Sequence, residues 1–159
     1  MTFLIESIVL CVLFTPMIKL ATWKQPAAFA NDYPSAVTNK LRTMGMIAQK
    51  PPARKADVLR KAVAMLVFAV LFALLLRYVN GAETFLSGAL TAYALWLVVE
   101  WYVFAGVDVL LAPFDRFYRA SGVSAFDREA VRFHLVRSLY GMALGIPFAL
   151  LTGLLVLSM

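Results

Sequence analysis

The stretch Phe85–Arg116, FLSGALTAYALWLVVEWYVFAGVDVLLAPFDR, decides the fold of this chain. Its apolar run is long enough to cross a bilayer as a helix, for which about 20 residues suffice. It nevertheless carries Glu100 and Asp108 within or beside that run. Because a carboxylate in a membrane span is costly to insert, such residues mark function more often than carboxylates on a soluble surface do.

The composition of the whole chain agrees with a membrane protein. Of its 159 residues, 62% are hydrophobic and 15% are charged, and the mean hydropathy is +0.80. Soluble domains have roughly 45–50% apolar and about 25% charged residues, so the excess apolar surface must face lipid. The single cysteine, Cys11, excludes an intrachain disulfide and a CxxC motif.

Four apolar segments predict an all-α integral membrane protein, a four-transmembrane-helix bundle that forms one domain over residues 1–159. We expect the spans at about residues 2–20, 62–79, 85–112 and 135–158. The loops 21–61 and 113–134 are rich in Lys and Arg, so the positive-inside rule makes both cytoplasmic and puts the N- and C-termini outside. The small size and the lack of sorting signals favour a bacterial cytoplasmic membrane.

The first loop contains a helical repeat of apolar residues. Val37, Leu41, Met44 and Ile47 follow Pro34 at spacings of four, three and three. This pattern predicts a short amphipathic helix that lies on the inner membrane surface.

Basic residues also gather beside the second span. We expect this cluster to contact anionic lipid headgroups rather than nucleic acid, with a specific phosphate-bearing ligand as the alternative. Its members are Lys50, Arg54, Lys55, Arg60 and Lys61.

The depth of Glu100 follows from helix geometry. A rise of about 1.5 Å per residue from Phe85 puts Glu100 about 22 Å along the helix, in the inner third of a core of roughly 30 Å. Asp108 is expected about 12 Å further on and, with α-helical winding, about 80° round from Glu100. The two carboxylates and Asp115 would then share one broad face near the inner end of the span.

Two interpretations of this inner end remain open. Glu100 needs a partner or a wet cavity, and Arg137 and Lys19 are its expected partners. The pairs could simply tie helix ends together. Alternatively, they could bound a cytoplasm-facing polar pocket in which Glu100 and Asp108 are the catalytic candidates. The candidates for ligand or anion binding in that pocket are Lys19, Arg137, Arg60 and Lys61.

The sequence does not identify a cofactor, and it predicts no metal site. His134 is the only histidine and has no His or Cys partner, which makes a poor transition-metal site. We expect it at the surface or the membrane interface, although its position also suits a proton carrier.

Polar groups are also expected at the outer ends of the first two spans. Glu6 on the first span and Arg77 on the second should lie at similar depth and form an outer ion pair. Glu83, in the following turn, is the alternative partner for Arg77, which could also snorkel to the interface.

The fourth span carries small residues at every fourth position. Gly141, Gly145, Ala149 and Gly153 form a smooth stripe, which predicts close packing against another helix. We expect that helix to belong to this chain, with a second subunit as the alternative.

The chain has no Ser-His-Asp pattern, no phosphate-cradling glycine loop and no dinucleotide fingerprint. The short outer connections, the small-residue stripe and the amphipathic helix favour a non-catalytic accessory, assembly or scaffold subunit of a membrane complex. Its partner would be another membrane protein or a second copy of the chain. The alternative is a membrane-embedded enzyme or carrier that acts on a lipid or amphiphile around Glu100. Proton or ion movement past Glu6, Arg77 and Glu100 is a third possibility.

Overall fold

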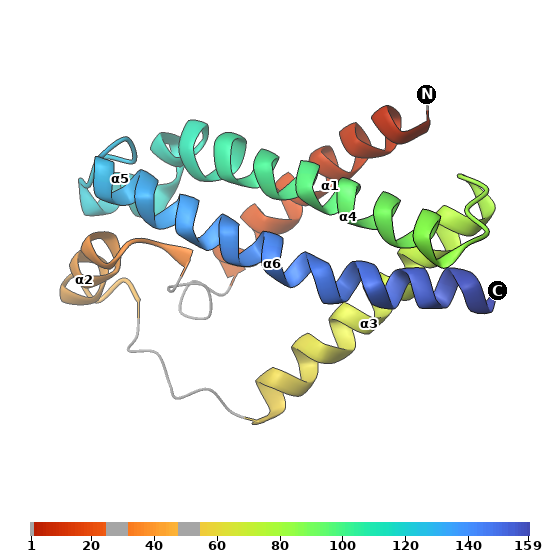
Figure 1. Ribbon diagram of the computed structural model, residues 1–159. Helices are drawn as coiled ribbons and strands as arrows, with labels where there is room; N and C mark the ends of the chain where they lie inside the picture. The colour runs from red at the N-terminus through yellow and green to blue at the C-terminus, as the bar shows by residue number, and fades with distance from the viewer. Residues whose placement is uncertain (1, 25–31, 48–54) are drawn as a thin grey trace. The chain divides into compact units, whose positions relative to one another are not determined.

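The computed structural model describes residues 2–24, 32–47 and 55–159 (Figure 1). Every regular element in these ranges is helical. The elements in chain order are α1 Thr2–Lys24, α2 Ser35–Thr43, α3 Lys55–Tyr78, α4 Phe85–Tyr102, the π-helix η2 Val103–Leu110, the 3₁₀ turn η3 Ala112–Phe114, α5 Arg116–Ser121 and α6 Arg128–Ser158. Of the basic cluster, Lys50 and Arg54 lie outside the described residues, as do the side chains of Lys55, Arg60 and Lys61.

Three segments of the described helices are long and apolar enough to cross a membrane. They are Phe3–Leu20, Phe85–Leu110 and Arg128–Ser158. The expected second span corresponds to the shorter apolar segment Ala62–Tyr78 of α3.

The residue contacts divide the chain into two units. Unit 1 comprises Met1–Ser7, Pro52–Val98 and Gly141–Met159. Unit 2 comprises Ile8–Pro51 and Val99–Tyr140. The helices α1, α4 and α6 each contribute residues to both units.

Unit 1 is held together by aromatic packing between α3, α4 and α6. The ring of Phe148 lies 4.8 Å from that of Trp96 and 5.3 Å from that of Phe72, centroid to centroid. The Trp96 indole also donates a hydrogen bond of 2.9 Å to the carbonyl of Gly141. These contacts fix α4 against α6 within this unit.

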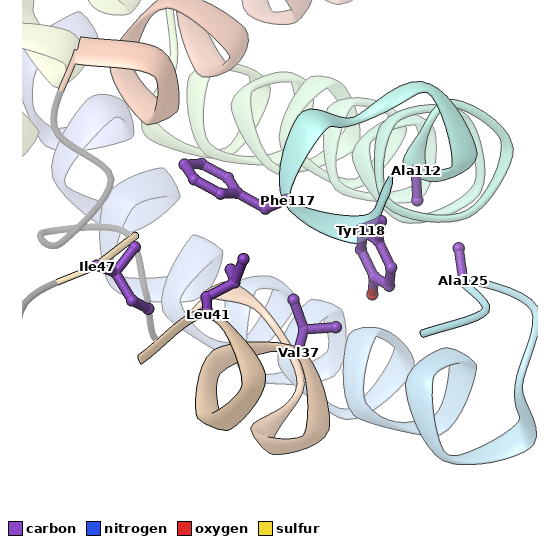
Figure 2. Packing of buried hydrophobic residues seen from close by; sticks show 7 residues of the cluster. All are labelled: Val37, Leu41, Ile47, Ala112, Phe117, Tyr118 and Ala125. Carbon is purple, nitrogen blue, oxygen red and sulfur yellow. The ribbon is translucent and has the colours of Figure 1, made fainter. Parts of the chain in front are cut away.

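The core of unit 2 forms where α2 packs on α5 (Figure 2). Val37 and Leu41 of α2 are fully buried together with Phe117 and Tyr118 of α5. Ile47, Ala112 and Ala125 complete the cluster.

This core changes the interpretation of the amphipathic helix. The helix is present, but its apolar face is covered by α5 rather than left free for the membrane surface. Met44 was expected on the same face, yet it lies just after the end of α2 and is exposed. The apolar face of α2 packs on protein because Phe117 and Tyr118 of α5 provide an apolar surface for it. The sequence pattern of α2 alone does not reveal that surface.

The segment after α4 also differs from the expected regular helix. The chain continues from Tyr102 as a π-helix, in which the amide of Leu111 donates to the carbonyl of Gly106, five residues earlier, at 2.9 Å. A π-helix has more residues per turn than an α-helix. The 80° expected between Glu100 and Asp108 assumed α-helical winding throughout, so that angle does not apply.

Candidate functional site

A cavity of about 400 Å³ lies within unit 2. The second half of α1 supplies Lys19, and the residues just before α2 supply Asp32 and Tyr33. Glu100 enters from the end of α4, and Asp108 from η2. Asp115, Tyr118 of α5, and His134, Arg137 and Ser138 of α6 complete the polar lining. A cavity of this size is typical of small-molecule sites, which fall at about 300–1,000 Å³.

Asp115 joins three elements at one side of the cavity. Its Oδ2 atom lies 3.1 Å from Nζ of Lys19 and accepts a hydrogen bond of 3.2 Å from the Tyr33 hydroxyl. Its Oδ1 atom accepts from the amide of Phe117 at 2.9 Å and so caps α5. Both carboxylate oxygens are engaged, so the role of Asp115 is structural.

Arg137 has a carboxylate partner of its own. Its guanidinium forms a salt bridge with Asp32 that joins α6 to the segment before α2. Both bases that we expected to pair with Glu100 are therefore paired with aspartates, Lys19 with Asp115 and Arg137 with Asp32.

His134 is at the centre of a chain of three polar side chains. Its Nε2 atom lies 2.7 Å from the Tyr118 hydroxyl, and its Nδ1 atom lies 3.3 Å from Oδ2 of Asp108. A proton on Nδ1 faces the carboxylate, whereas a bare Nδ1 would be repelled by it. We therefore assign the proton to Nδ1 and let the phenol donate to Nε2.

The surroundings of this chain oppose ionisation of the phenol. Burial, followed by the negative charges of Asp108 and Asp115, raises the pKa of Tyr118. A neutral phenol is the form that can donate to His134. The pKa shift therefore supports the assigned direction of the hydrogen bond.

His134 is buried, with 2% of its surface exposed, and is therefore not the surface residue that the sequence suggested. It lies three and four residues before Arg137 and Ser138, so the three share one face of α6. That spacing was visible in the sequence. What could not be seen was that Tyr118 and Asp108 would meet the imidazole from other elements.

Glu100 is half-buried at the end of α4. Among the described residues, no basic side chain lies within 4 Å of its carboxylate. Ser138 donates to its main-chain carbonyl at 3.3 Å. Nearby, the hydroxyls of Thr15 and Tyr102 lie 2.6 Å apart and link α1 to α4. Glu100 therefore lies at the cavity wall without a salt bridge in the described part of the chain.

The residues predicted for the outer ion pair lie in unit 1. Glu6 accepts a hydrogen bond of 2.9 Å from the Asn80 amide. The guanidinium of Arg77 lies 3.9 Å from the carboxylate of Glu83, its alternative partner, and donates to the carbonyl of Ala82 at 3.3 Å. The structure thus places Glu6 and Arg77 with different partners.

The predicted small-residue stripe lies against α4 of the same chain. A Cβ atom on Gly145 would lie 2.3 Å from the Trp96 ring. A Cβ atom on Gly153 would lie 2.7 Å from the carbonyl oxygen of Phe85. Ala149, between them, is buried, and Gly141 accepts the hydrogen bond of Trp96.

Within the described ranges, no group of three or more His, Cys, Asp or Glu residues is placed to hold a metal ion. The site supplies instead a buried imidazole and two carboxylates, Glu100 and Asp108, for which the described residues provide no salt bridge to a lysine or arginine. It can bind through charge and hydrogen bonds, and it can hold or pass a proton. No family model, no curated protein and no solved structure matches this chain.

Proposed function

We propose that this chain is a membrane protein that binds a lipid or another amphiphile in the cavity of unit 2, as an enzyme or carrier. It would cross the membrane four times, with α3 as the second span and both basic loops in the cytoplasm. Three apolar helical segments of sufficient length support the membrane location, and the Lys and Arg of the loops support the orientation.

The observation that carries the proposal is the cavity itself. Its polar side offers Glu100 and the chain Asp108–His134–Tyr118. Its apolar side includes Val103, Phe104 and Val107, on the same turns of the chain as the two carboxylates. An amphiphile matches both surfaces, because its polar head can meet the carboxylates while its chain packs on the apolar wall.

Catalysis would use groups already in place. His134 is positioned by Asp108 on one side and Tyr118 on the other, which is the arrangement of an oriented general base or acid. Glu100, which forms no salt bridge in the described part of the chain, is the second group that could accept a proton. A carrier would use the same groups for binding alone.

A second candidate is the accessory or scaffold subunit that the sequence favoured. The observation behind it is that only 6% of the segment Phe3–Leu20 is buried. A helix of a partner subunit could cover this surface, as lipid could.

Native mass spectrometry of the protein, released gently from its own membrane, separates the two candidates. We expect a bound amphiphile that is retained by the wild type and by Glu83→Gln but lost in Glu100→Gln. Glu83 is the matched control because it is exposed and lies in unit 1. A ligand-free chain accompanied by a polypeptide at fixed stoichiometry would contradict the proposal and make this chain a subunit.

A further inference from the structure

The charges around the cavity in unit 2 do not balance. Of the described side chains that line it, four are carboxylates and two are strong bases. Lys19 is paired with Asp115, and Arg137 with Asp32. Two carboxylates, Glu100 and Asp108, remain without a salt bridge to a lysine or arginine in the described part of the chain, and Asp108 lies beside the imidazole of His134.

Asp108 remains open to a ligand. Its carboxylate is 3.3 Å from Nδ1 of His134, and its side chain keeps 30% of its surface exposed. The Nδ1 atom, although buried, has no partner with the alignment of a hydrogen bond. The contact between them is thus looser than the bond of 2.7 Å on the other side of the ring. The Asp108 carboxylate can therefore turn toward a donor in the cavity without breaking a strong hydrogen bond.

Aromatic rings form part of the same wall. Tyr33, Phe104 and Tyr118 line the cavity, and the rings of Tyr33 and Tyr118 lie 5.9 Å apart. The faces of aromatic rings attract cations, and aromatic surroundings with carboxylates are a common means of binding ammonium groups. An anionic head group would instead meet two carboxylates that, among the described residues, form no salt bridge with a lysine or arginine.

We propose that the head group bound in this cavity is an ammonium ion, held by Glu100 and Asp108 against the aromatic wall. The inference rests on the proposed function and adds the chemical class of the ligand. The apolar part of the ligand lies along Val103, Phe104 and Val107. Lys19 and Arg137, which the sequence suggests as anion-binding residues, instead form salt bridges with Asp115 and Asp32.

The test is equilibrium binding of three decyl probes to the full chain in phosphatidylcholine nanodiscs, with empty nanodiscs as the blank. The probes are decyltrimethylammonium, decyl glucoside and decyl sulfate, which share a chain and differ in head-group charge. We expect saturable binding of the ammonium probe, weaker binding of the glucoside and the weakest binding of the sulfate. Equal or tighter binding of the sulfate or the glucoside would overturn the ammonium assignment while leaving an amphiphile site. Failure of all three probes to bind would overturn both proposals.

Substitutions then test which carboxylates bind the head group of the ammonium probe. Glu100→Gln and Asp108→Asn should each weaken binding of the ammonium probe by about tenfold or more, because each removes one partner of a partly desolvated charge pair. Glu83→Gln should leave binding unchanged. Unchanged binding in a folded Glu100→Gln variant would overturn the assignment. If Asp108→Asn does not fold, the ammonium assignment is still tested by Glu100→Gln and by the order in which the wild type binds the three probes.

Discussion

At the scale of single residues, the Tyr118 hydroxyl links the core of unit 2 to its cavity. Its ring packs with Val37 and Leu41, while its hydroxyl donates to His134. Tyr118→Phe keeps the ring and leaves Nε2 of His134 buried without a partner. We expect a loss of about 1–3 kcal/mol in the free energy of unfolding. Thermal unfolding in a neutral detergent, followed by circular dichroism, measures it.

The same substitution should change the pH dependence of stability. Burial and the neighbouring aspartates raise the pKa of Tyr118 in the folded chain, whereas an unfolded tyrosine ionises near pH 10. The stability contributed by a group with a raised folded pKa is complete below its unfolded pKa and is lost as pH rises above it. The wild type should therefore lose its advantage over Tyr118→Phe at alkaline pH. A difference that is the same at neutral and alkaline pH would contradict this.

Adding one methyl group at Gly153 should lower the stability of the packing between α4 and α6. Its Cβ would meet the carbonyl oxygen of Phe85, and a backbone atom of α4 cannot move aside as a side-chain end can. We expect Gly153→Ala to lower the free energy of unfolding by about 1–3 kcal/mol. Leu154→Ala, at an exposed neighbouring position, is the control and should cost little. Equal stability of the two variants would mean that α4 and α6 do not pack closely at this point.

At the scale of elements, α2 and α5 stabilise each other. Leu41 is 1% exposed, whereas Met44, just beyond the helix, is 57% exposed. We expect Leu41→Ala to cost roughly 2–5 kcal/mol of stability and Met44→Ala to cost little. Comparing the melting temperatures of the two variants tests whether α2 packs on protein. If Leu41→Ala weakens membrane association without lowering stability, α2 lies on the lipid surface instead.

The elements also explain how far the sequence could predict this structure. The apolar runs around residues 85–110 and 135–158 are long and carry few charges, so their helices were predictable from length and composition. The helix at Val37 and Leu41 was predictable from the helical spacing of its apolar residues. The π-helical winding of Val103–Leu110 was not predictable from the sequence. It depends on which backbone carbonyl each amide bonds, and apolar side chains are compatible with either an α-helix or a π-helix.

The site was predictable only in part for a related reason. Glu100 and Asp108 could be singled out because a carboxylate in an apolar run is costly. The actual partners of Lys19 and Arg137 could not be predicted, because the sequence does not show which aspartates the folded loops bring close to these two bases. Asp32 and Asp115 are surface-like residues in the sequence, and only the fold brings them to these bases.

At the scale of the whole molecule, the charge distribution predicts which side of the membrane each loop occupies. The single native cysteine makes labelling practical, since a Cys11→Ser background leaves no other thiol. In that background, Met44→Cys and Phe126→Cys should react with an impermeant maleimide only from the cytoplasmic side. Val79→Cys should react only from the opposite side. All three positions are exposed. Labelling of all three from one side would rule out the four-span topology.

Photo-crosslinking can show whether an amphiphile occupies the cavity of unit 2. The probe is an alkyl chain that carries a photoreactive group and either an ammonium or a glucoside head. Peptide mass spectrometry then locates the modified residues. We expect labelling within Val103–Leu110, and an excess of unlabelled probe should suppress it. Labelling confined to exposed apolar positions such as Leu66 and Leu144, and unaffected by competitor, would contradict it.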